Sequence, residues 1–532
     1  MSASGQVGFR NQARGWWRGL TDLIRGLIVV GIEVLVFALL FALDHSLGFA
    51  AALIFAIFWL RRMPRLPWRL VAEAGIVAIF GIGWLAGSTP GSIPLSLALA
   101  FGISWIPGRS RRWALPLIAV ALAVTYPFVV GHLFTIPVFQ AFPDVPTAIY
   151  MLVFMTMAVG LNIVVGYAGL LDLGYVAFYA IGAYTAGWFA SAQFAGQKCS
   201  NPHFAIDNCP TTVVPKLTYV LGGIGVPEGT GGIHLSVFLV ILIAGIITAL
   251  FGIMIGLPTL RLRGDYLAIV TLGFGEILPQ IARNGDHLFG YNITNGANGI
   301  TPIDAPGFGH HLSNVTGGIL PAYFLNIFHT TIWHHTIDSY DLFFWTAIVL
   351  LSITVFCSLR LRDSRLGRAW IAIREDETAA AAMGVPLMRT KTWAYAGGAF
   401  FGGAAGAFYA SQKSGTFPDD FFFNISVFVL CMVILGGMGN VWGVLLGAAF
   451  LSYLNKFGLG NIGFWINAHI HVGSWHPNFD VPLYASGIYG LIIVVVMLFR
   501  PEGLLPSARR KRELHEGETH DQPLYDLQHE GA

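Results

Sequence analysis

The chain has 532 residues, of which 55% are hydrophobic and only 11% are charged, and its mean hydropathy is +0.66. This balance excludes a soluble globular protein and predicts a membrane protein with room for many crossings, since each crossing needs about 20 apolar residues. The net charge of +2 decides little, because the positions of the charges carry the information in a membrane protein.

Long apolar runs predict an all-α, polytopic membrane protein with about fourteen transmembrane helices, about ten of them after residue 113. In chain order the predicted spans are 20–42, 47–60, 70–87, 93–106, 114–131, 147–166, 174–192, 233–258, 266–282, 342–359, 392–411, 424–438, 442–457 and 483–499. Several of these, notably 47–60, 93–106 and 424–438, are short enough to be re-entrant or broken helices instead.

Basic residues gather in a few of the loops between these spans. If the N-terminus is cytoplasmic, every dense basic cluster falls on the cytoplasmic side, namely 10–25, 61–69, 109–112, 261–263, 360–391 and 509–512. The pattern follows the positive-inside rule and places both termini in the cytoplasm. No cleavable signal peptide is predicted, since the first apolar run is too long and lacks a small-residue cleavage site.

The opposite side receives the long loops 193–232 and 283–341 and the shorter loop 458–482. Cys199 and Cys209 lie in the first of these loops. A disulfide between them fits an oxidising periplasm, and two free thiols are the alternative. Cys357 and Cys431 lie in predicted spans, where packing is the expected role.

The chain lacks the motifs of enzymes and metal proteins. The dipeptide Gly-Lys does not occur, so there is no phosphate-binding P-loop and no ATP hydrolysis by that route. No His-Glu-x-x-His, Cys-x-x-Cys or Gly-x-Ser-x-Gly motif is present, and the spacing of the outer-loop histidines fits solvated side chains better than a metal site. We therefore expect no catalytic residues, no metal site and no cofactor.

Few ionisable residues fall inside the predicted spans, and each is a functional candidate because a charge at membrane depth is costly. Glu33 can pair with a neighbouring span. Asp172 lies near a cytoplasmic boundary, where a helix cap is an equal explanation. Glu276 follows two glycines inside a span and is the strongest candidate for a transport pathway.

Glycines cluster between neighbouring spans at two places in the chain. The connection 166–174 is too short for an ordinary loop, and it predicts either a broken helix that lines a cavity or close packing of two helices. A second break lies at 435–443. Because Gly-interrupted spans in separate halves indicate a transport pathway, the predicted pathway residues are Asn162, Gly169, Asp172, Gly174, Tyr175, Glu276 and Gly437.

A charged island at 360–391 separates two apolar spans. Its alternation of alanine with charged residues predicts a short amphipathic helix at the membrane surface, offered to a soluble partner. An ordinary solvated loop is the alternative.

Several stretches together resemble one family. They are 161–187, 260–276, 294–300, 367–384, 435–447 and 499–505, and they are similar to the larger type of permease subunit in ATP-binding-cassette (ABC) importers for branched-chain amino acids. The resemblance implies a permease core at 114–505, an N-terminal extension at 1–113 with about four spans, and a cytoplasmic tail at 506–532 that is expected to be disordered.

The resemblance also implies partners and a location. Such a subunit lies in the bacterial inner membrane, surrounded by lipid, and is not itself an enzyme. It works with two cytoplasmic ATPase subunits, a second permease subunit and a periplasmic substrate-binding protein, and no nucleic acid is involved.

The family's coupling helix, which docks on the ATPase, carries Glu-Ala-Ala followed by a glycine. Here Glu377, Thr378, Ala379 and Gly384 match it, with Thr378 departing from the pattern and no later Ile-x-Leu-Pro element. Charged neighbours can set the orientation of docking. The implied coupling residues are Gly367, Arg368, Arg374, Glu375, Asp376, Glu377, Ala379 and Gly384.

Other functions remain open at this stage. Members of the same family carry urea or short amides. An ion-coupled secondary transporter would work without an ATPase, although such carriers usually hold more buried charges. A membrane scaffold would bind soluble partners without moving a solute.

Overall fold

The computed structural model describes residues 142–193, 232–259, 265–288, 292–306, 339–469, 480–499 and 503–505, with short stretches before residue 131 and between 331 and 336. Two compact units are present, Pro143–Gly460 with Asp480–Ala532 and Met1–Phe142 with Asn461–Phe479. Glu33, Cys199, Cys209, the tail 506–532 and most of the first five predicted spans lie outside the described residues.

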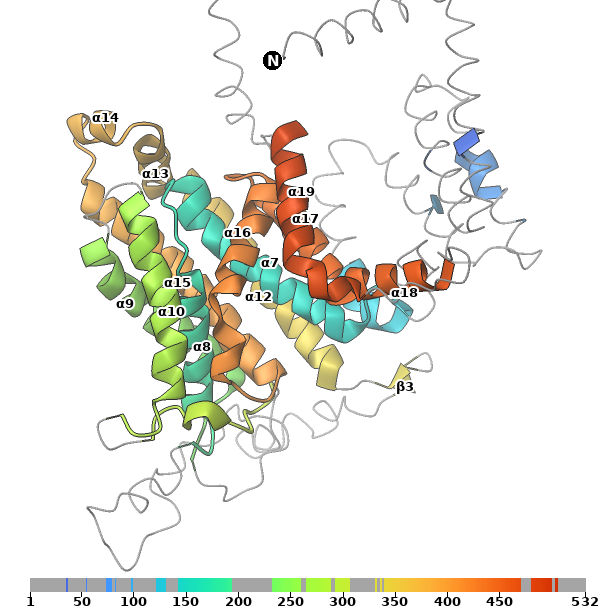
Figure 1. Cartoon of the computed structure of the whole chain (residues 1–532), viewed down its shortest axis with the longest axis horizontal. Coiled ribbons are helices and arrows are strands. Elements are labelled where there is room, and N and C mark those ends of the chain that lie inside the picture. Colours follow the sequence, from blue (N-terminus) through green and yellow to red (C-terminus); the bar gives the residue numbers. More distant parts are fainter. Residues whose placement is uncertain are drawn as a thin grey trace, which may run out of the picture. The chain divides into compact units, whose positions relative to one another are not determined.

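The described residues are mostly helical, which confirms the all-α prediction (Figure 1). The long helices are α7 (Val145–Asn162), α8 (Tyr175–Phe189), α9 (Val237–Thr259), α10 (Asp265–Arg283), α12 (Ser339–Asp363), α15 (Leu387–Gln412), α16 (Phe423–Gly436), α17 (Val441–Tyr453) and α19 (Ala485–Phe499). Each predicted span from 147–166 onward coincides with one of them. Five helical stretches among the described residues are long and apolar enough to cross a membrane.

Short elements join the long helices. Two π-helices extend α7 and α17, η2 (Ile163–Tyr167) and η7 (Leu454–Gly458), and α18 (Leu459–His469) follows the second. The helices α13 (Arg365–Glu375) and α14 (Glu377–Ala382) lie between α12 and α15. The remaining short elements are the 3₁₀ turns η4 (Gly296–Asn298), η6 (Pro418–Phe421) and η8 (Val481–Tyr484) and the strands β1 (Ala190–Ser191), β2 (Ile233–His234), β3 (Thr331–Ile332) and β4 (His335–Thr336).

Helix α15 is the centre of the packing and lies against α9, α8 and α7. Small residues allow this approach: a Cβ placed on Gly182 of α8 would lie 2.0 Å from the carbonyl oxygen of Gly403 in α15. Gly403 in turn faces Thr248 of α9. In a bilayer, where lipid is as apolar as leucine, close contact of this kind supplies much of the attraction between helices.

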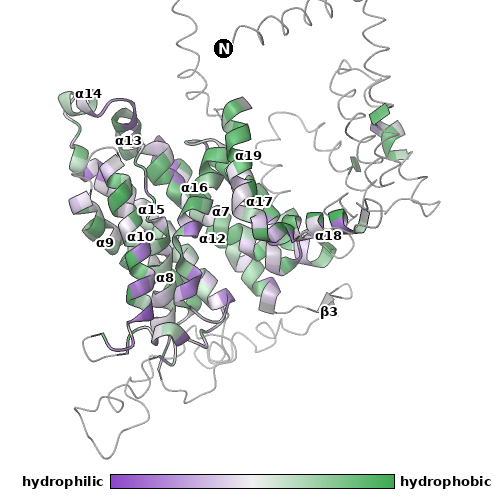
Figure 2. Ribbon diagram, viewed as in Figure 1, coloured by the Kyte–Doolittle hydropathy of each residue, from purple (hydrophilic) through white to green (hydrophobic). Residues whose placement is uncertain are grey.

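The surface of the unit carries many large apolar side chains. Leu250 and Met254 of α9 and Val494 of α19 are each at least 60% exposed. Figure 2 shows α16 and α19 hydrophobic along most of their length, whereas α10 carries hydrophilic positions. Exposed apolar faces of this extent fit helices that face hydrocarbon.

Candidate functional site

The charged island folds as two helices. α13 begins after Ser364, whose side chain accepts a hydrogen bond from the backbone N–H of Gly367, and α14 begins after Asp376. The Asp376 carboxylate accepts from the Thr378 hydroxyl and from the backbone N–H groups of Ala379 and Thr378, and these bonds hold its pKa below the usual 3.8. The predicted single amphipathic helix is therefore interrupted at Asp376, where a cap ends one helix and starts the next.

Buried contacts hold the two helices on the ends of α12 and α15. Trp370 is 1% exposed, and its indole N–H donates to the carbonyl of Thr390 at 2.8 Å. The ammonium of Lys391, itself 5% exposed, lies 2.7 Å from the carboxylate of Glu377. Gly367 packs on the last turn of α12, since a Cβ there would lie 2.2 Å from the Arg362 carbonyl. The island is thus a fixed platform and not a loose loop.

The outer face of the platform mixes charge with small residues. Five of the predicted coupling residues are exposed on it: Arg368, Glu375, Asp376, Ala379 and Gly384. Met383, at the end of α14, is 84% exposed, and open space surrounds Gly384. An exposed methionine beside alanines and a glycine provides an adaptable apolar contact with charges around it.

Arg374 points the other way, into the helices. Its Nη1 donates to the carbonyl of Gly166, in η2, at 2.6 Å. Its side chain crosses Gly169, where φ is +69° and an added Cβ would lie 2.7 Å from the Arg374 Cγ. A side chain at position 169 would meet both a strained backbone and the arginine, so glycine is required there.

Asn162, the last residue of α7, lies in the same region as Arg374. It is fully buried, and its Oδ1 accepts from the backbone N–H of Gly439 at 2.9 Å. Gly439 has a φ of +85°, and an added Cβ would lie 3.2 Å from the Arg374 Nη1. The two predicted glycine breaks, 166–174 and 435–443, therefore meet at Arg374. We name this contact of Asn162, Gly166, Gly169, Arg374 and Gly439 the arginine joint.

The first break combines a local change of helix geometry with close packing. Its start is the π-helix η2, a local unwinding of α7 that is frequent at functional sites. Its end is tightly packed: a Cβ on Gly174 would lie 2.2 Å from the carbonyl of Thr271 in α10. The start of α8 is also held from α16, where the Ser426 hydroxyl accepts from the N–H of Val176 at 2.9 Å.

The second break is a tight turn that the backbone of residues 504–505 holds by hydrogen bonds. Gly437 ends α16 with a φ of +108°, and Asn440 caps α17. The backbone of 504–505 bonds to it, with Leu504 N–H to the Leu435 carbonyl and Leu505 N–H to the Gly436 carbonyl. The sequence indicated Gly437 but missed Gly439 and Asn440, although the Gly-Met-Gly-Asn run carries the signal of a turn.

Asp172 lies in the connection before α8 and is 1% exposed. Its Oδ1 accepts from the N–H of Gly174 at 2.9 Å, and no hydrogen bond reaches its Oδ2 from the described residues. Burial raises the pKa of this carboxyl to about 7, against the lowering effect of the Gly174 bond. Asp172 thus stabilises a turn at the start of α8, and its burial favours the protonated carboxyl.

The other two predicted pathway residues lie apart from the joint. Tyr175 is completely buried, and its hydroxyl donates to the carbonyl of Gly398 in α15, so it belongs to the core. Glu276 is exposed on α10 and borders a shallow hollow of about 490 Å³ with Gln280 and Asn284.

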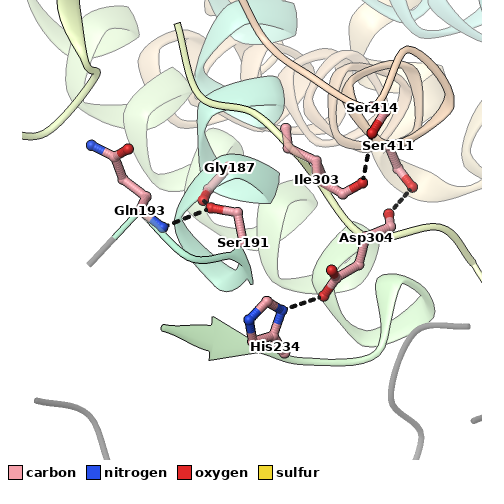
Figure 3. A network of polar contacts seen from close by, with 8 residues as sticks. All are labelled: Gly187, Ser191, Gln193, His234, Ile303, Asp304, Ser411 and Ser414. Atoms are coloured by element: carbon pink, nitrogen blue, oxygen red, sulfur yellow. Dashed lines mark hydrogen bonds and ion pairs between the residues drawn. The ribbon is translucent and has the colours of Figure 1, made fainter. Parts of the chain in front are cut away.

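A polar network lies at the other end of α15 (Figure 3). The ring of His234, next to α9, is 2.8 Å from the carboxylate of Asp304, and the Ser411 hydroxyl donates to the Asp304 carbonyl. Ser191 bonds to Gly187 at the end of α8, and Ser414 to Ile303. These bonds tie the ends of α8 and α15 to the 303–304 segment, and no pattern in the sequence indicated them.

Comparison with known proteins gives consistent matches. Residues 145–497 match the family described as the permease component of branched-chain amino acid transport systems. The chain is 33% identical over 416 residues to the high-affinity branched-chain amino acid transport system permease protein LivM of Salmonella typhimurium, covering 78% of this chain and 80% of that one. The protein of the same name from Escherichia coli is 33% identical over 414 residues, 77% and 79% of the two chains.

A more distant relative is the probable branched-chain amino acid transport permease protein LivM of Methanocaldococcus jannaschii. It is 24% identical over 352 residues, which cover 66% of this chain and 90% of the relative. No solved structure matches the chain.

Proposed function

This chain belongs to the family of permease components of branched-chain amino acid transport systems, and from that premise we propose that it is the membrane permease of an ABC importer for leucine, isoleucine and valine. The observation that carries the proposal is the match to the two LivM permeases over about four fifths of their length. The chain is a transport subunit and has no P-loop of its own, so the energy of ATP comes from two cytoplasmic ATPase subunits.

The platform formed by α13 and α14 docks on an ATPase subunit. Its fixed backbone, its exposed small residues and Met383 suit a groove in the partner, and Arg368, Glu375 and Asp376 set the orientation by charge. Glu377 acts differently, because its bond to the buried Lys391 holds α14 in place.

The arginine joint transmits the movement. When the ATPase pulls on α13, Arg374 carries the displacement to the Gly166 carbonyl and to the turn at Gly439. The displacement then reaches α7, α16 and α17 together. Breaks in helices are suitable hinges, because an unwound segment can change its dihedral angles without disturbing a packed core.

The exposed side of α10 faces the second permease subunit. Glu276, Gln280 and Asn284 lie along this side with Ile277 and Ile281. A carboxylate in contact with lipid is costly, whereas a partner subunit or a hydrated path between two subunits can accept it. Glu276 therefore lies at the edge of the translocation path, on the side shared with the second permease subunit.

The remaining parts follow the expectations from the sequence. The chain lies in the bacterial inner membrane, has both termini in the cytoplasm, and crosses the bilayer about fourteen times, about four of them in the extension at 1–113. A periplasmic binding protein delivers the amino acid.

Reconstitution tests this function. The chain is purified with the two ATPases, the second permease and the binding protein and placed in liposomes. We expect ATP-dependent uptake of labelled leucine, and none by this chain alone. Uptake by the isolated chain under an ion gradient would favour a secondary transporter, and uptake of urea in place of leucine would change the substrate.

A further inference from the structure

A cavity of about 660 Å³ lies at the end of the unit that is remote from the α13–α14 platform. Its position follows from the chain: α15 starts at the platform and ends at Gln412, and the cavity is bordered by η6, which comes next. The other walls come from the starts of α7 and α19, from α16 as far as Cys431, from the π-helix η7, and from Tyr179 of α8 and Tyr409 of α15. Pockets for small ligands typically have about 300–1,000 Å³.

One wall of the cavity is a continuous row of four aromatic rings. Tyr150 and Phe154 lie 4.6 Å apart between ring centres, Phe154 and Phe428 5.5 Å, and Phe428 and Tyr489 5.1 Å. The rings come from α7, α16 and α19. An aliphatic side chain can be buried against the faces of such rings.

The polar groups at this wall leave one donor unused. Asn455 of η7 donates from Nδ2 to the Tyr150 hydroxyl at 3.0 Å, and its Oδ1 accepts from the Tyr489 hydroxyl at 2.7 Å. Tyr150 is thus an acceptor in this pair, and its own hydroxyl proton meets no acceptor among the described residues. The ammonium of the exposed Lys456 lies 5.8 Å from the centre of the Tyr150 ring. Lys456 is not among the residues that line the cavity, so the donor available to an anion there is the free O–H of Tyr150, from which a carboxylate can accept.

Carboxylates of the protein border the cavity at η6. Asp420 pairs with Lys413, with 2.6 Å from Nζ to Oδ2, and Asp419 pairs with Arg283. Each carboxylate has more lone pairs than one cation occupies, so an additional ammonium can share it. The cavity therefore offers an apolar wall, a donor for an anion and acceptors for a cation.

We propose that this cavity binds the free amino acid during transport. The branched side chain packs on the aromatic row, the carboxylate accepts from the Tyr150 hydroxyl, and the α-ammonium bonds to Asp420. The proposal rests on the proposed function for the identity of the amino acid, and it adds a site within this subunit at which the amino acid is recognised after release from the binding protein.

A native cysteine reports on occupancy, because Cys431 lines the cavity and is a free thiol. The complete importer is reconstituted with Cys199, Cys209 and Cys357 replaced by serine, and its leucine uptake is confirmed. The rate at which a small uncharged thiosulfonate modifies Cys431 is then measured, with and without ATP. Leucine should slow modification about tenfold when about nine tenths of the sites are occupied, whereas glutamate and lysine should not.

Four variants make the test more specific. Val494→Cys with Cys431→Ser places the thiol on an exposed side of α19, where leucine should leave the rate unchanged. Tyr150→Phe removes only the hydroxyl and should reduce protection by leucine, and Phe428→Trp should abolish it by filling the cavity. Phe450→Trp, an equal change on the exposed side of α17, should not affect protection.

The outcomes separate this site from the function on which it rests. An importer that takes up leucine but shows no protection of Cys431 in either nucleotide state overturns the site and leaves the proposed function intact. Protection by phosphatidylethanolamine in the vesicles, without protection by leucine, assigns the cavity to a lipid and also overturns it. Protection by leucine in a complex that does not transport leucine supports the site and refutes the proposed function.

Discussion

Replacement of Arg374 by alanine tests the arginine joint directly. The change removes the hydrogen bond from Nη1 to the Gly166 carbonyl and the side chain that crosses Gly169. It leaves the outer face of the platform unchanged, because Arg374 points toward the helices while Arg368 and Met383 point outward. We therefore expect the variant to assemble with its ATPases and to lose transport.

The structure sets the size of the effect. A hydrogen bond from a charged donor contributes about 1.5–3 kcal/mol, and the partial exposure of Arg374 favours the lower part of that range. A loss of about 2 kcal/mol from the coupling of α13 to η2 corresponds to about a thirtyfold fall in the rate of coupled transport, since about 1.4 kcal/mol is tenfold. Arg374→Lys keeps the charge but loses the planar fork, and it should recover only part of the rate.

The assay compares ATP hydrolysis with leucine uptake in the same liposomes. Arg374→Ala should keep ATP hydrolysis and lose uptake, so the number of ATP molecules used for each leucine rises. Arg389→Ala, an exposed arginine at the start of α15, is the matched control and should change neither rate. An Arg374→Ala importer with the normal ratio of ATP to leucine would refute the role of the joint.

Three further predictions concern the packing and the titrating groups. Gly403→Ala should lower the melting temperature of the purified chain by an amount that corresponds to about 1–3 kcal/mol, because the new methyl lies 2.0 Å from the Thr248 hydroxyl; an unchanged melting temperature would contradict this packing. Lys391→Met removes the buried partner of Glu377, so proteolysis near α14 should become faster, and equal rates would show that the pair does not hold α14. Burial raises the pKa of Asp172 from 3.8 to about 7, so ionisation destabilises the fold increasingly as pH rises from about 4 to about 7. The Asp172→Asn variant should therefore melt at a higher temperature than the native chain between pH 5 and pH 8. A lower melting temperature of the variant over that interval would refute the effect.

The helices from α7 to α19 could be predicted because each span is a long apolar run, a property of adjacent residues. The interruption of the island at Asp376 is also local, since it follows from a cap residue. The arginine joint is not local: Arg374 and Gly166 are 208 positions apart, and Asn162 and Gly439 are 277 apart. The sequence indicated most of these residues separately, and only packing brings them together.

The change from α-helix to π-helix at η2 could not be predicted from the sequence for another reason. The unwound residues of η2 are as apolar as those of α7, so the hydropathy pattern continues through the change of geometry. The cavity was missed because its wall combines α7, α16, η7 and α19, whose relative positions no periodicity specifies. Tyr175 shows the same limit: its position beside a glycine break suggested a pathway residue, and only the packing of α8 on α15 reveals that its hydroxyl bonds to the Gly398 carbonyl.

Helix α7 connects the arginine joint with the cavity that we propose binds the amino acid. Its first half holds Tyr150 and Phe154 at the cavity, and its last residue, Asn162, and the following η2 form the arginine joint. A helix transmits a displacement along its axis because its hydrogen bonds resist stretching, whereas η2 can absorb or release a fraction of a turn. A pull on α13 that straightens η2 would therefore move the Tyr150 end of α7 against α16 and α19. Since the aromatic row is shared among these three helices, such a shift would separate the rings that hold the aliphatic side chain, and the amino acid would lose its apolar contacts as the ATPase acts.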